Sequence, residues 1–125
     1  MKWLLDTHIL LWVMRDADEL SARARDLIDD ADEVYVSTIS LWEAAIKASV
    51  GKLLVGPDRV EEGALRAGFL PLHVTWAHAI TLQHLPLHHR DPFDRMLLAQ
   101  AVSEPMHFMT HHAGLVRYSP LVTVV

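Results

Sequence analysis

The chain has 125 residues and a formal net charge of −5 with its histidines counted as neutral. Hydrophobic residues make up 51% and charged residues 22%, which allows one sizeable core and excludes a disordered chain. The acidic balance argues against a protein that coats nucleic acid by charge alone, but it allows an enzyme whose acidic residues surround a metal ion. Cysteine is absent, which excludes disulfides and thiolate metal sites. We expect a single domain over residues 1–125.

No apolar run approaches the roughly 20 residues that a membrane helix needs. The longest run, residues 9–14, predicts only a turn or two of buried helix. The first residues also lack the cleavage pattern of a signal peptide. We therefore expect a cytoplasmic protein with no membrane segment.

Short apolar segments alternate with helical patterns along the chain. The predicted strands are 2–5, 34–36, 69–72, 106–109 and 121–125. The predicted helices are 7–14, 21–28, a third that begins at Ser37 or Thr38 and ends at Gly51, 58–67, 75–82 and 92–102. This alternation predicts an α/β fold with a parallel sheet, helices on both of its faces and right-handed crossovers.

Polar residues follow the predicted strands at one edge of this sheet, where ligands bind in open parallel sheets. Asp6 comes directly after the first strand, and Glu43 lies about one and a half turns into the helix after the second. Asp91 and Asp94 begin the last clear helix, and residues 110–112 (Thr-His-His) follow the fourth strand. We expect these four polar groups to converge.

Carboxylates placed together raise one another's pKa unless a cation compensates them. Oxygen-rich sites of this kind suit Mg²⁺ or Mn²⁺, which would activate a water and stabilise charge on a phosphate. No serine or cysteine nucleophile motif and no glycine-rich phosphate loop is present. Phosphodiester hydrolysis by a metal-activated water is the reaction that such a site predicts.

Each acidic residue also has a plainer interpretation. Asp6 is equally placed to cap the helix that follows it. Glu43, taken alone, is typical of a glutamate on a helix surface. Asp91 precedes Pro92 and is well explained as a helix cap, which leaves Asp94 free to face the sheet edge. The argument for a site therefore depends on their joint placement.

Three blocks of the sequence together resemble the PIN-domain family and, within it, the VapC-type toxins. The blocks are residues 4–12 (LLDTHILLW), 37–43 (STISLWE) and 89–101 (HRDPFDRMLLAQA). They are spread over essentially the whole chain. The resemblance implies a three-layer α/β/α domain with a short parallel central sheet, endonucleolytic cleavage of RNA with Mg²⁺ or Mn²⁺, inhibition by a cognate antitoxin, and a homodimer.

The resemblance also assigns residues. Asp6, Glu43 and Asp94 match the family's invariant acidic positions, so they are the expected catalytic and metal-binding carboxylates, and Asp91 matches a further acidic position. Four other polar side chains are expected near this centre, as weak ligands or as neighbours that shape it: Ser37, Ser40, Thr110 and His112.

The last motif departs from the family pattern, because relatives usually carry Thr-x-Asp after the late strand. Thr110 fits, but His112 stands in the aspartate position. Imidazole ligates Mn²⁺ but suits Mg²⁺ poorly, and the change removes a negative charge. An alternative hypothesis is therefore a non-catalytic PIN-like module that binds an antitoxin or RNA. A phosphohydrolase that forms an aspartyl phosphate is disfavoured, because His8 stands where a second acid is needed.

Several other residues invite a functional interpretation. The sequence has nine histidines, but the adjacent pairs point opposite ways on an extended chain, so we do not expect a zinc centre. His8 could reach the site near Asp6, but we expect it to pack at the start of the first helix. Arg95 either contacts an RNA phosphate or holds an acidic neighbour in place. Lys47 and Lys52 are expected to be solvated, with a place along the RNA groove as the alternative.

The four tryptophans are expected to be core residues rather than platforms for stacking bases. They are Trp3, Trp12, Trp42 and Trp76.

Overall fold

A five-stranded parallel sheet forms the centre of the molecule in the computed structural model, which describes residues 1–125. The strands are β1 (Lys2–Leu5), β2 (Glu33–Ser37), β3 (Leu70–Leu72), β4 (His107–Thr110) and β5 (Val122–Val124). Their order across the sheet is β3-β2-β1-β4-β5, and every neighbouring pair is parallel. The predicted α/β class and the parallel sheet are confirmed.

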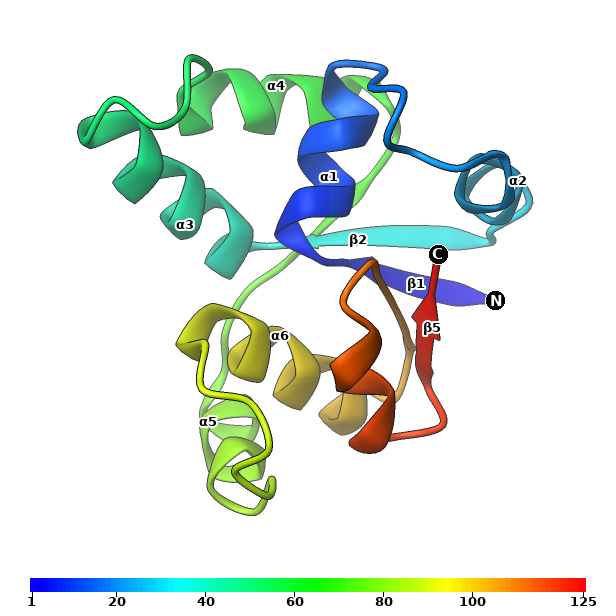
Figure 1. Cartoon of the computed structure of the whole chain (residues 1–125), viewed down its shortest axis with the longest axis vertical. Helices are drawn as coiled ribbons and strands as arrows, with labels where there is room; N and C mark the ends of the chain where they lie inside the picture. Colours follow the sequence, from blue (N-terminus) through cyan, green and yellow to red (C-terminus); the bar gives the residue numbers. More distant parts are fainter.

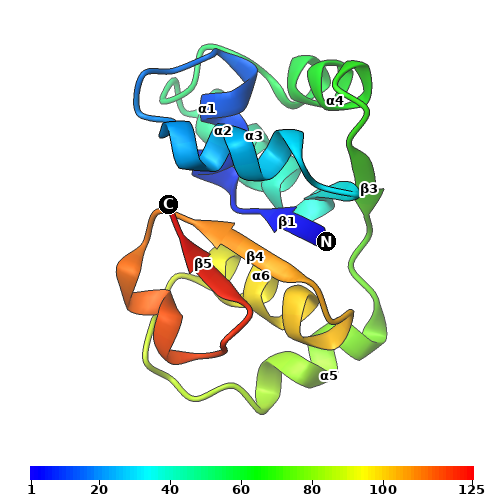
Figure 2. The ribbon, with the colours of Figure 1, turned by 90° about the vertical axis from the view of Figure 1, so that its right-hand side faces the viewer.

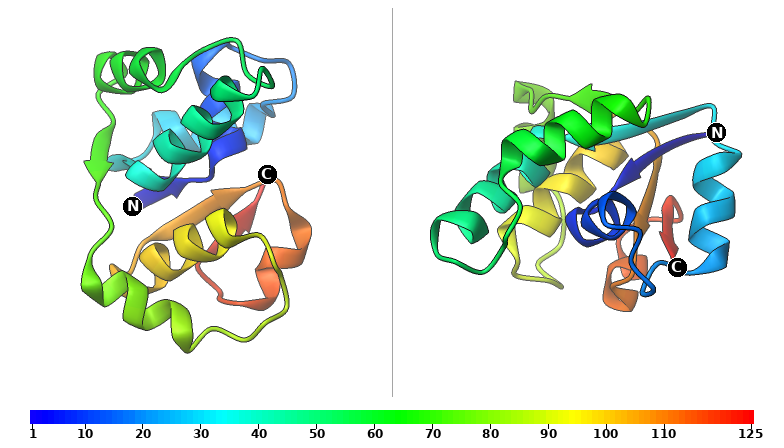
Figure 3. Two further views of the ribbon diagram at one scale, coloured as in Figure 1. Left: turned by 90° about the vertical axis from the view of Figure 1, so that its left-hand side faces the viewer. Right: turned by 90° about the horizontal axis from the view of Figure 1, so that it is seen from above.

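Six α-helices cover the sheet on both faces. They are α1 (Thr7–Met14), α2 (Ala22–Asp29), α3 (Thr38–Ser49), α4 (Pro57–Arg66), α5 (Trp76–Gln83) and α6 (Pro92–Ser103). Helices α1 to α4 lie on one side of the sheet, whereas α5 and α6 lie on the other (Figures 1, 2 and 3). None of these helices combines the length and the apolar character that crossing a bilayer requires.

Two hydrophobic cores separate the layers. Alternate residues of a strand face opposite sides of a sheet, so Trp3 and Leu5 join the core under α1 to α4. Leu4, between them, joins the core formed mainly by α6, where Leu97 and Leu98 are fully buried. This arrangement confirms the expected three-layer α/β/α architecture.

Local sequence signals set the ends of the helices. Gly51 and Gly68 adopt positive φ angles of 76° and 82° just after α3 and α4, a conformation that a side chain would disfavour. At its N-terminal end, α4 has Pro57 at the first helical position. Five helices have an N-cap side chain that accepts a backbone hydrogen bond: Asp6, Ser21, Ser37, Thr75 and Asp91.

The structure differs from the sequence expectations in two respects. A 3₁₀ helix, η1 (Ala113–Arg117), joins β4 to β5 and was not predicted, because it is too short to show a helical period. The expectation that all four tryptophans lie in the core is wrong for Trp42 and Trp76, whose side chains are 58% and 90% exposed. Trp42 makes an edge contact with the Phe93 ring on α6, and neither tryptophan is covered by a further layer of the fold. Trp3 is buried and Trp12 is half-buried, as expected for core residues.

Ser37 links two layers of the fold. Its hydroxyl donates a hydrogen bond to Gln100 Oε1 at 2.6 Å and accepts one from the backbone N–H of Ile39 at 3.0 Å. Ser37 and Gln100 are fully buried, so no water can replace either bond in the folded protein.

We expect Ser37→Ala to lower the free energy of unfolding by about 2–3 kcal/mol, because it removes a helix cap and leaves the Gln100 oxygen unpaired. Urea denaturation followed by circular dichroism measures this loss. Ser49→Ala is the matched control: its exposed hydroxyl bonds only to the Ile46 carbonyl, so we expect a change within about 0.5 kcal/mol. Equal losses in the two variants would contradict the role assigned to Ser37.

Candidate metal centre

Asp6 stands at the carboxyl end of β1, and both of its carboxylate oxygens are engaged. Oδ1 accepts a hydrogen bond from the N–H of Ile9 at 2.9 Å, which caps α1 as one interpretation expected. Oδ2 accepts a hydrogen bond from the hydroxyl of Thr110 at the end of β4. The residue is only 2% exposed. The carboxylate therefore has a fixed orientation at the sheet edge, and capping does not turn it away from that edge.

Asp94 lies on the first turn of α6, and its side chain is 19% exposed. Its Oδ2 is 2.9 Å from Nε2 of His89. Burial raises the pKa of Asp94, the hydrogen bond with His89 opposes this, and the negative charges of Asp91 and Asp6 raise it further. Asp6, Asp91 and Asp94 are thus close enough to interact electrostatically, and a bound cation would relieve their repulsion.

Asp91 serves as the N-cap of α6, as its plainer interpretation predicted. Its Oδ1 accepts hydrogen bonds from the N–H groups of Phe93 at 2.8 Å and Asp94 at 3.2 Å. The residue is exposed. Its charge nevertheless acts on Asp94, so it contributes to the negative potential at this end of the helix.

Glu43 is a buried residue of α3 rather than a surface glutamate, since it is only 6% exposed. Its Oε2 pairs with Nζ of Lys47 at 3.0 Å, and its Oε1 is buried without any hydrogen-bond partner. A buried carboxylate oxygen without a partner is costly in free energy. The expectation that Lys47 is solvated is wrong, because this ion pair holds its side chain against α3 and half buries it.

The four other polar residues expected near the centre make different contacts. They are Ser37, Ser40, Thr110 and His112. Ser40 Oγ is 3.0 Å from Oγ1 of Thr7, the residue after Asp6, so it joins α3 to the start of α1. Thr110 bonds directly to Asp6. Ser37 is occupied by its helix cap and Gln100, as described above. The backbone N–H of His112 donates to Thr110 Oγ1 at 3.0 Å, while its exposed ring packs against that of His89 with a centroid distance of 4.5 Å.

Three histidines lie beside the acidic residues, and of these only His89 was missed by sequence reasoning. His89 bonds to Asp94, and Asp6, His8 and His111 have ligand atoms that all lie within 4.8 Å of one another. The expectation that His8 packs into the fold is wrong, because its side chain is exposed and its ring lies only against those of Trp12 and His111. A signal for His89 was present, since it lies in the same sequence block as Asp91 and Asp94.

Arg95 bonds to backbone carbonyls and a tyrosine rather than to a carboxylate. Its guanidinium donates to the backbone carbonyls of Pro86 at 2.9 Å and Leu85 at 3.3 Å, and to the Tyr118 hydroxyl at 3.2 Å. The interpretation that it holds an acidic neighbour is therefore wrong, and the alternative contact with an RNA phosphate stays a prediction. The Tyr118 hydroxyl also accepts from the N–H of His89 at 2.8 Å. Arg95 and Tyr118 together fix the loop that presents His89 to Asp94.

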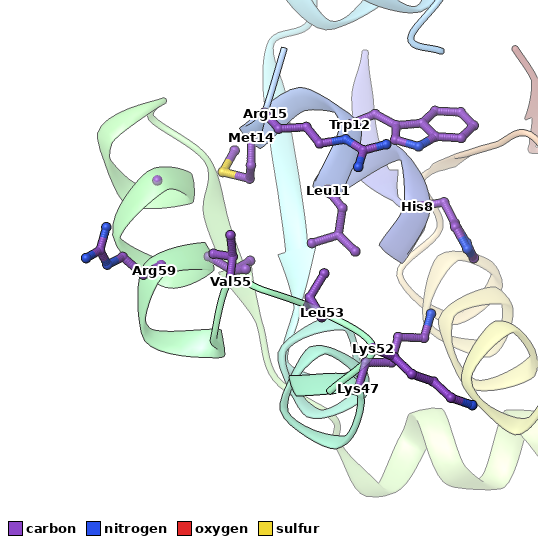
Figure 4. Close-up of a pocket in the computed structure, with 12 residues that line it drawn as sticks. His8, Leu11, Trp12, Met14, Arg15, Lys47, Lys52, Leu53, Val55 and Arg59 are labelled. Carbon is purple, nitrogen blue, oxygen red and sulfur yellow. The ribbon is translucent and has the colours of Figure 1, made fainter. Parts of the chain in front are cut away.

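A pocket of about 380 Å³ adjoins this region between α1, α3 and α4. His8 lies at its rim, and its apolar wall includes Leu11 and Trp12. Figure 4 shows the ammonium groups of Lys47 and Lys52 directed toward the same side as His8. Arg15 and Arg59 also line the pocket. Arg15 pairs with Glu19 and Lys47 with Glu43, whereas Lys52 and Arg59 have no ion-pair partner, so the lining keeps a net positive charge although the whole chain is acidic.

The chemistry of the donor groups fits a divalent cation. The structure brings Asp6 and Asp91 close enough to Asp94 for their charges to act on it, in addition to the burial that raises its pKa. Glu43 pairs with Lys47 and keeps one unpaired buried oxygen, and Asp6, Glu43 and Asp94 do not form a cluster with all ligand atoms within 4.8 Å. Carboxylates of this number suit Mg²⁺ or Mn²⁺, whereas the adjacent imidazoles suit transition metals.

Comparisons with known proteins agree with this fold. The family model for the PIN domain matches residues 3–118. A DNA-bound VapBC structure from Salmonella typhimurium is 20% identical with a TM-score of 0.71, over 100% of this chain and 97% of that chain. VapBC2 from Rickettsia felis, bound to a DNA fragment from its promoter, is 14% identical with a TM-score of 0.71, over 100% and 98% of the two chains. FitAcB from Neisseria gonorrhoeae is 21% identical with a TM-score of 0.58, over 90% and 88%. The search of curated protein sequences gave no match.

We expect Asp94→Asn to stabilise the metal-free protein at pH 7. Because burial raises the pKa of Asp94 in the folded state, ionising it costs more there than in the unfolded chain. This cost is present at neutral pH and disappears as the pH falls toward 3.8, the ordinary value for aspartate. Urea unfolding in the presence of EDTA at both pH values measures it.

Asp26→Asn provides the control, since Asp26 is exposed on α2, and we expect its effect to stay within about 0.5 kcal/mol at both pH values. A wild-type protein more stable at pH 7 than Asp94→Asn would show that the His89 hydrogen bond outweighs the burial of the charge.

Proposed function

Because the chain belongs to the PIN-domain family, we propose that it is a metal-dependent endoribonuclease and the toxin of a VapC-type toxin–antitoxin pair. PIN domains are generally metal-dependent nucleases, which gives the reaction class. The observation that carries the proposal is the buried carboxylate of Asp6 at the sheet edge, whose charge acts together with that of Asp91 on the half-buried Asp94. Glu43 keeps one unpaired oxygen beside its ion pair with Lys47, so a bound cation would relieve negative charge that the chain compensates only in part.

In this proposal Asp6, Glu43 and Asp94 hold Mg²⁺ or Mn²⁺, with Asp91 contributing charge at the entrance. When bound, the ion would make a water a better nucleophile and stabilise the charge that develops on the scissile phosphate. The neighbouring side chains keep the carboxylates in place: Thr110 orients Asp6, and His89 orients Asp94. No protein side chain is needed as a nucleophile.

The positive pocket supports a polyanionic substrate. Contacts to phosphates supply much of the affinity of proteins for nucleic acids, and they come mainly from lysine and arginine. Lys47, Lys52 and Arg59 line a pocket that shares His8 with the metal centre, so a strand held there would lie beside the carboxylates. RNA rather than DNA is proposed on the resemblance to VapC-type toxins.

Exposed apolar side chains support a protein partner. Trp42, Ile46 and Val50 are exposed at intervals of four residues, so they form one apolar stripe along α3 and its end. We propose an antitoxin as one partner and a second copy of the chain as another. The similar solved structures are toxin–antitoxin complexes, which supports the antitoxin, and such a pair acting on RNA is proposed to reside in the cytoplasm.

We expect the purified protein to cleave a structured RNA with Mn²⁺ and to lose activity in EDTA. Asp6→Asn and Asp94→Asn should each reduce the cleavage rate by at least about 100-fold, because each removes a charge that holds the ion near the phosphate. Gel electrophoresis of end-labelled RNA gives the rates.

Asp26→Asn serves here as well, because it changes an exposed aspartate outside the centre and should retain full activity. Cleavage that persists in EDTA, or at the wild-type rate in both centre variants, would refute the proposed mechanism. A wild-type protein that binds RNA or an antitoxin but cleaves nothing would favour the non-catalytic module instead.

A further inference from the structure

We propose that Asp6, His8 and His111 form a carboxylate–imidazole site that binds a first-row transition metal in preference to Mg²⁺. This inference deepens the proposed function, because it adds nitrogen ligands to one carboxylate of the same centre. It concerns the identity of the metal and the residues that select it.

Three separate elements bring the donors together. Asp6 follows β1, His8 lies on the first turn of α1, and His111 follows β4. One ligand atom from each lies within 4.8 Å of the others, a spacing that a single ion can bridge with small side-chain adjustments. Asp6 is buried while His8 and His111 are exposed, so the carboxylate forms the floor of the site and the imidazoles form its rim.

The imidazole nitrogens are available for coordination. Neither ring makes a hydrogen bond within the protein, and the only close polar neighbour is Asp6, whose Oδ2 is 3.9 Å from Nδ1 of His111. That distance is too long for a hydrogen bond. The nitrogens therefore lie next to a carboxylate without being satisfied by it.

Aromatic contacts hold the two rings in this arrangement. The centroids of His8 and His111 are 4.9 Å apart, and the Trp12 ring is 4.9 Å from His111 and 6.4 Å from His8. Edge and tilted contacts at these distances are favourable. Trp12 is thus a positioning residue whose contacts restrict the orientation of the two imidazole rings. The Thr110 hydrogen bond does the same for the carboxylate.

Mixed nitrogen and oxygen donors select among divalent ions. Mg²⁺ takes oxygen ligands and retains several waters, whereas imidazole suits Mn²⁺, Co²⁺, Ni²⁺ and Zn²⁺. Affinity for such a site rises from Mn²⁺ through Co²⁺ and Ni²⁺. Two imidazoles beside Asp6 should therefore shift the preference of this chain away from Mg²⁺.

Metal binding without RNA tests the proposal. The full chain is stripped with EDTA and dialysed, then titrated calorimetrically with Zn²⁺, Co²⁺ and Mg²⁺, and the Co²⁺ complex is examined by visible absorption. We expect one Co²⁺ or Zn²⁺ per chain, bound at least about tenfold more tightly than Mg²⁺. His8→Ala and His111→Ala should each weaken binding by about tenfold or more and change the Co²⁺ spectrum.

His84→Ala is the matched control, because His84 is an exposed histidine at the end of α5, and its binding should equal that of the wild type. Both site histidines are exposed, so their removal should leave the thermal unfolding of the metal-free protein unchanged. The proposal is overturned if Mg²⁺ binds as tightly as Zn²⁺, or if His8→Ala and His111→Ala bind metal as the wild type does. Loss of RNA cleavage with this binding intact would instead refute the nuclease function and leave the site standing.

Discussion

The hydrogen bond from Thr110 to Asp6 joins the carboxyl ends of two adjacent central strands, and the remaining groups of the metal centre are arranged around it. It follows from the parallel register of β1 and β4, in which Leu5 pairs with Met109. The next residue of each strand is then Asp6 or Thr110, and the two side chains meet at the edge of the sheet. Any shift in this register would separate the carboxylate from the histidine that follows Thr110.

The carboxylates of Asp94 and Glu43 lower the stability of the fold, and a bound cation would relieve this cost. Burial and neighbouring charge raise the pKa of Asp94, and one oxygen of Glu43 is buried without a partner. Lys47 offsets the charge of Glu43 from one side only. Groups that destabilise a fold in this way are characteristic of functional sites, where a substrate or ion supplies the missing interaction.

Much of the fold follows from local signals in the sequence. Short apolar strands, capping residues and the glycines after α3 and α4 predicted every strand and α-helix to within a few residues, since each signal acts on its own neighbourhood. The burial of side chains was harder to predict. Trp42 and Trp76 follow the helical pattern yet face outward, because exposure depends on which helix faces receive a covering layer, and that is a property of the assembled fold.

The candidate site, like the fold, could be predicted from the sequence only in part. The placement of Asp6 at the sheet edge, near enough to Asp94 for their charges to interact, could be predicted because parallel strands bring their carboxyl ends to one edge. Glu43 pairs with Lys47 on its own helix, and its part in the centre stays a prediction. The roles of the histidines could not be predicted, because each depends on a ring direction set by contacts between distant segments. The adjacent histidines do point opposite ways: His111 turns toward Asp6 and His8, while His112 turns toward His89. The pair therefore makes no metal site by itself but places one ring near each of two carboxylates.

The different directions of the two rings bear on His112, the histidine that stands in the family's aspartate position. His112 packs against His89, the partner of Asp94, and contacts Asp6 only through the backbone N–H that reaches Thr110. The lost negative charge therefore belongs to the Asp94 side of the centre, while the imidazole next to Asp6 comes from His111. The replacement therefore removes charge beside Asp94, and the imidazoles near Asp6 come from His8 and His111. In the proposed transition-metal site an ion at Asp6 would meet nitrogen as well as oxygen donors. The metal preference of this chain would then be set by His8 and His111 rather than by the residue in the family's aspartate position.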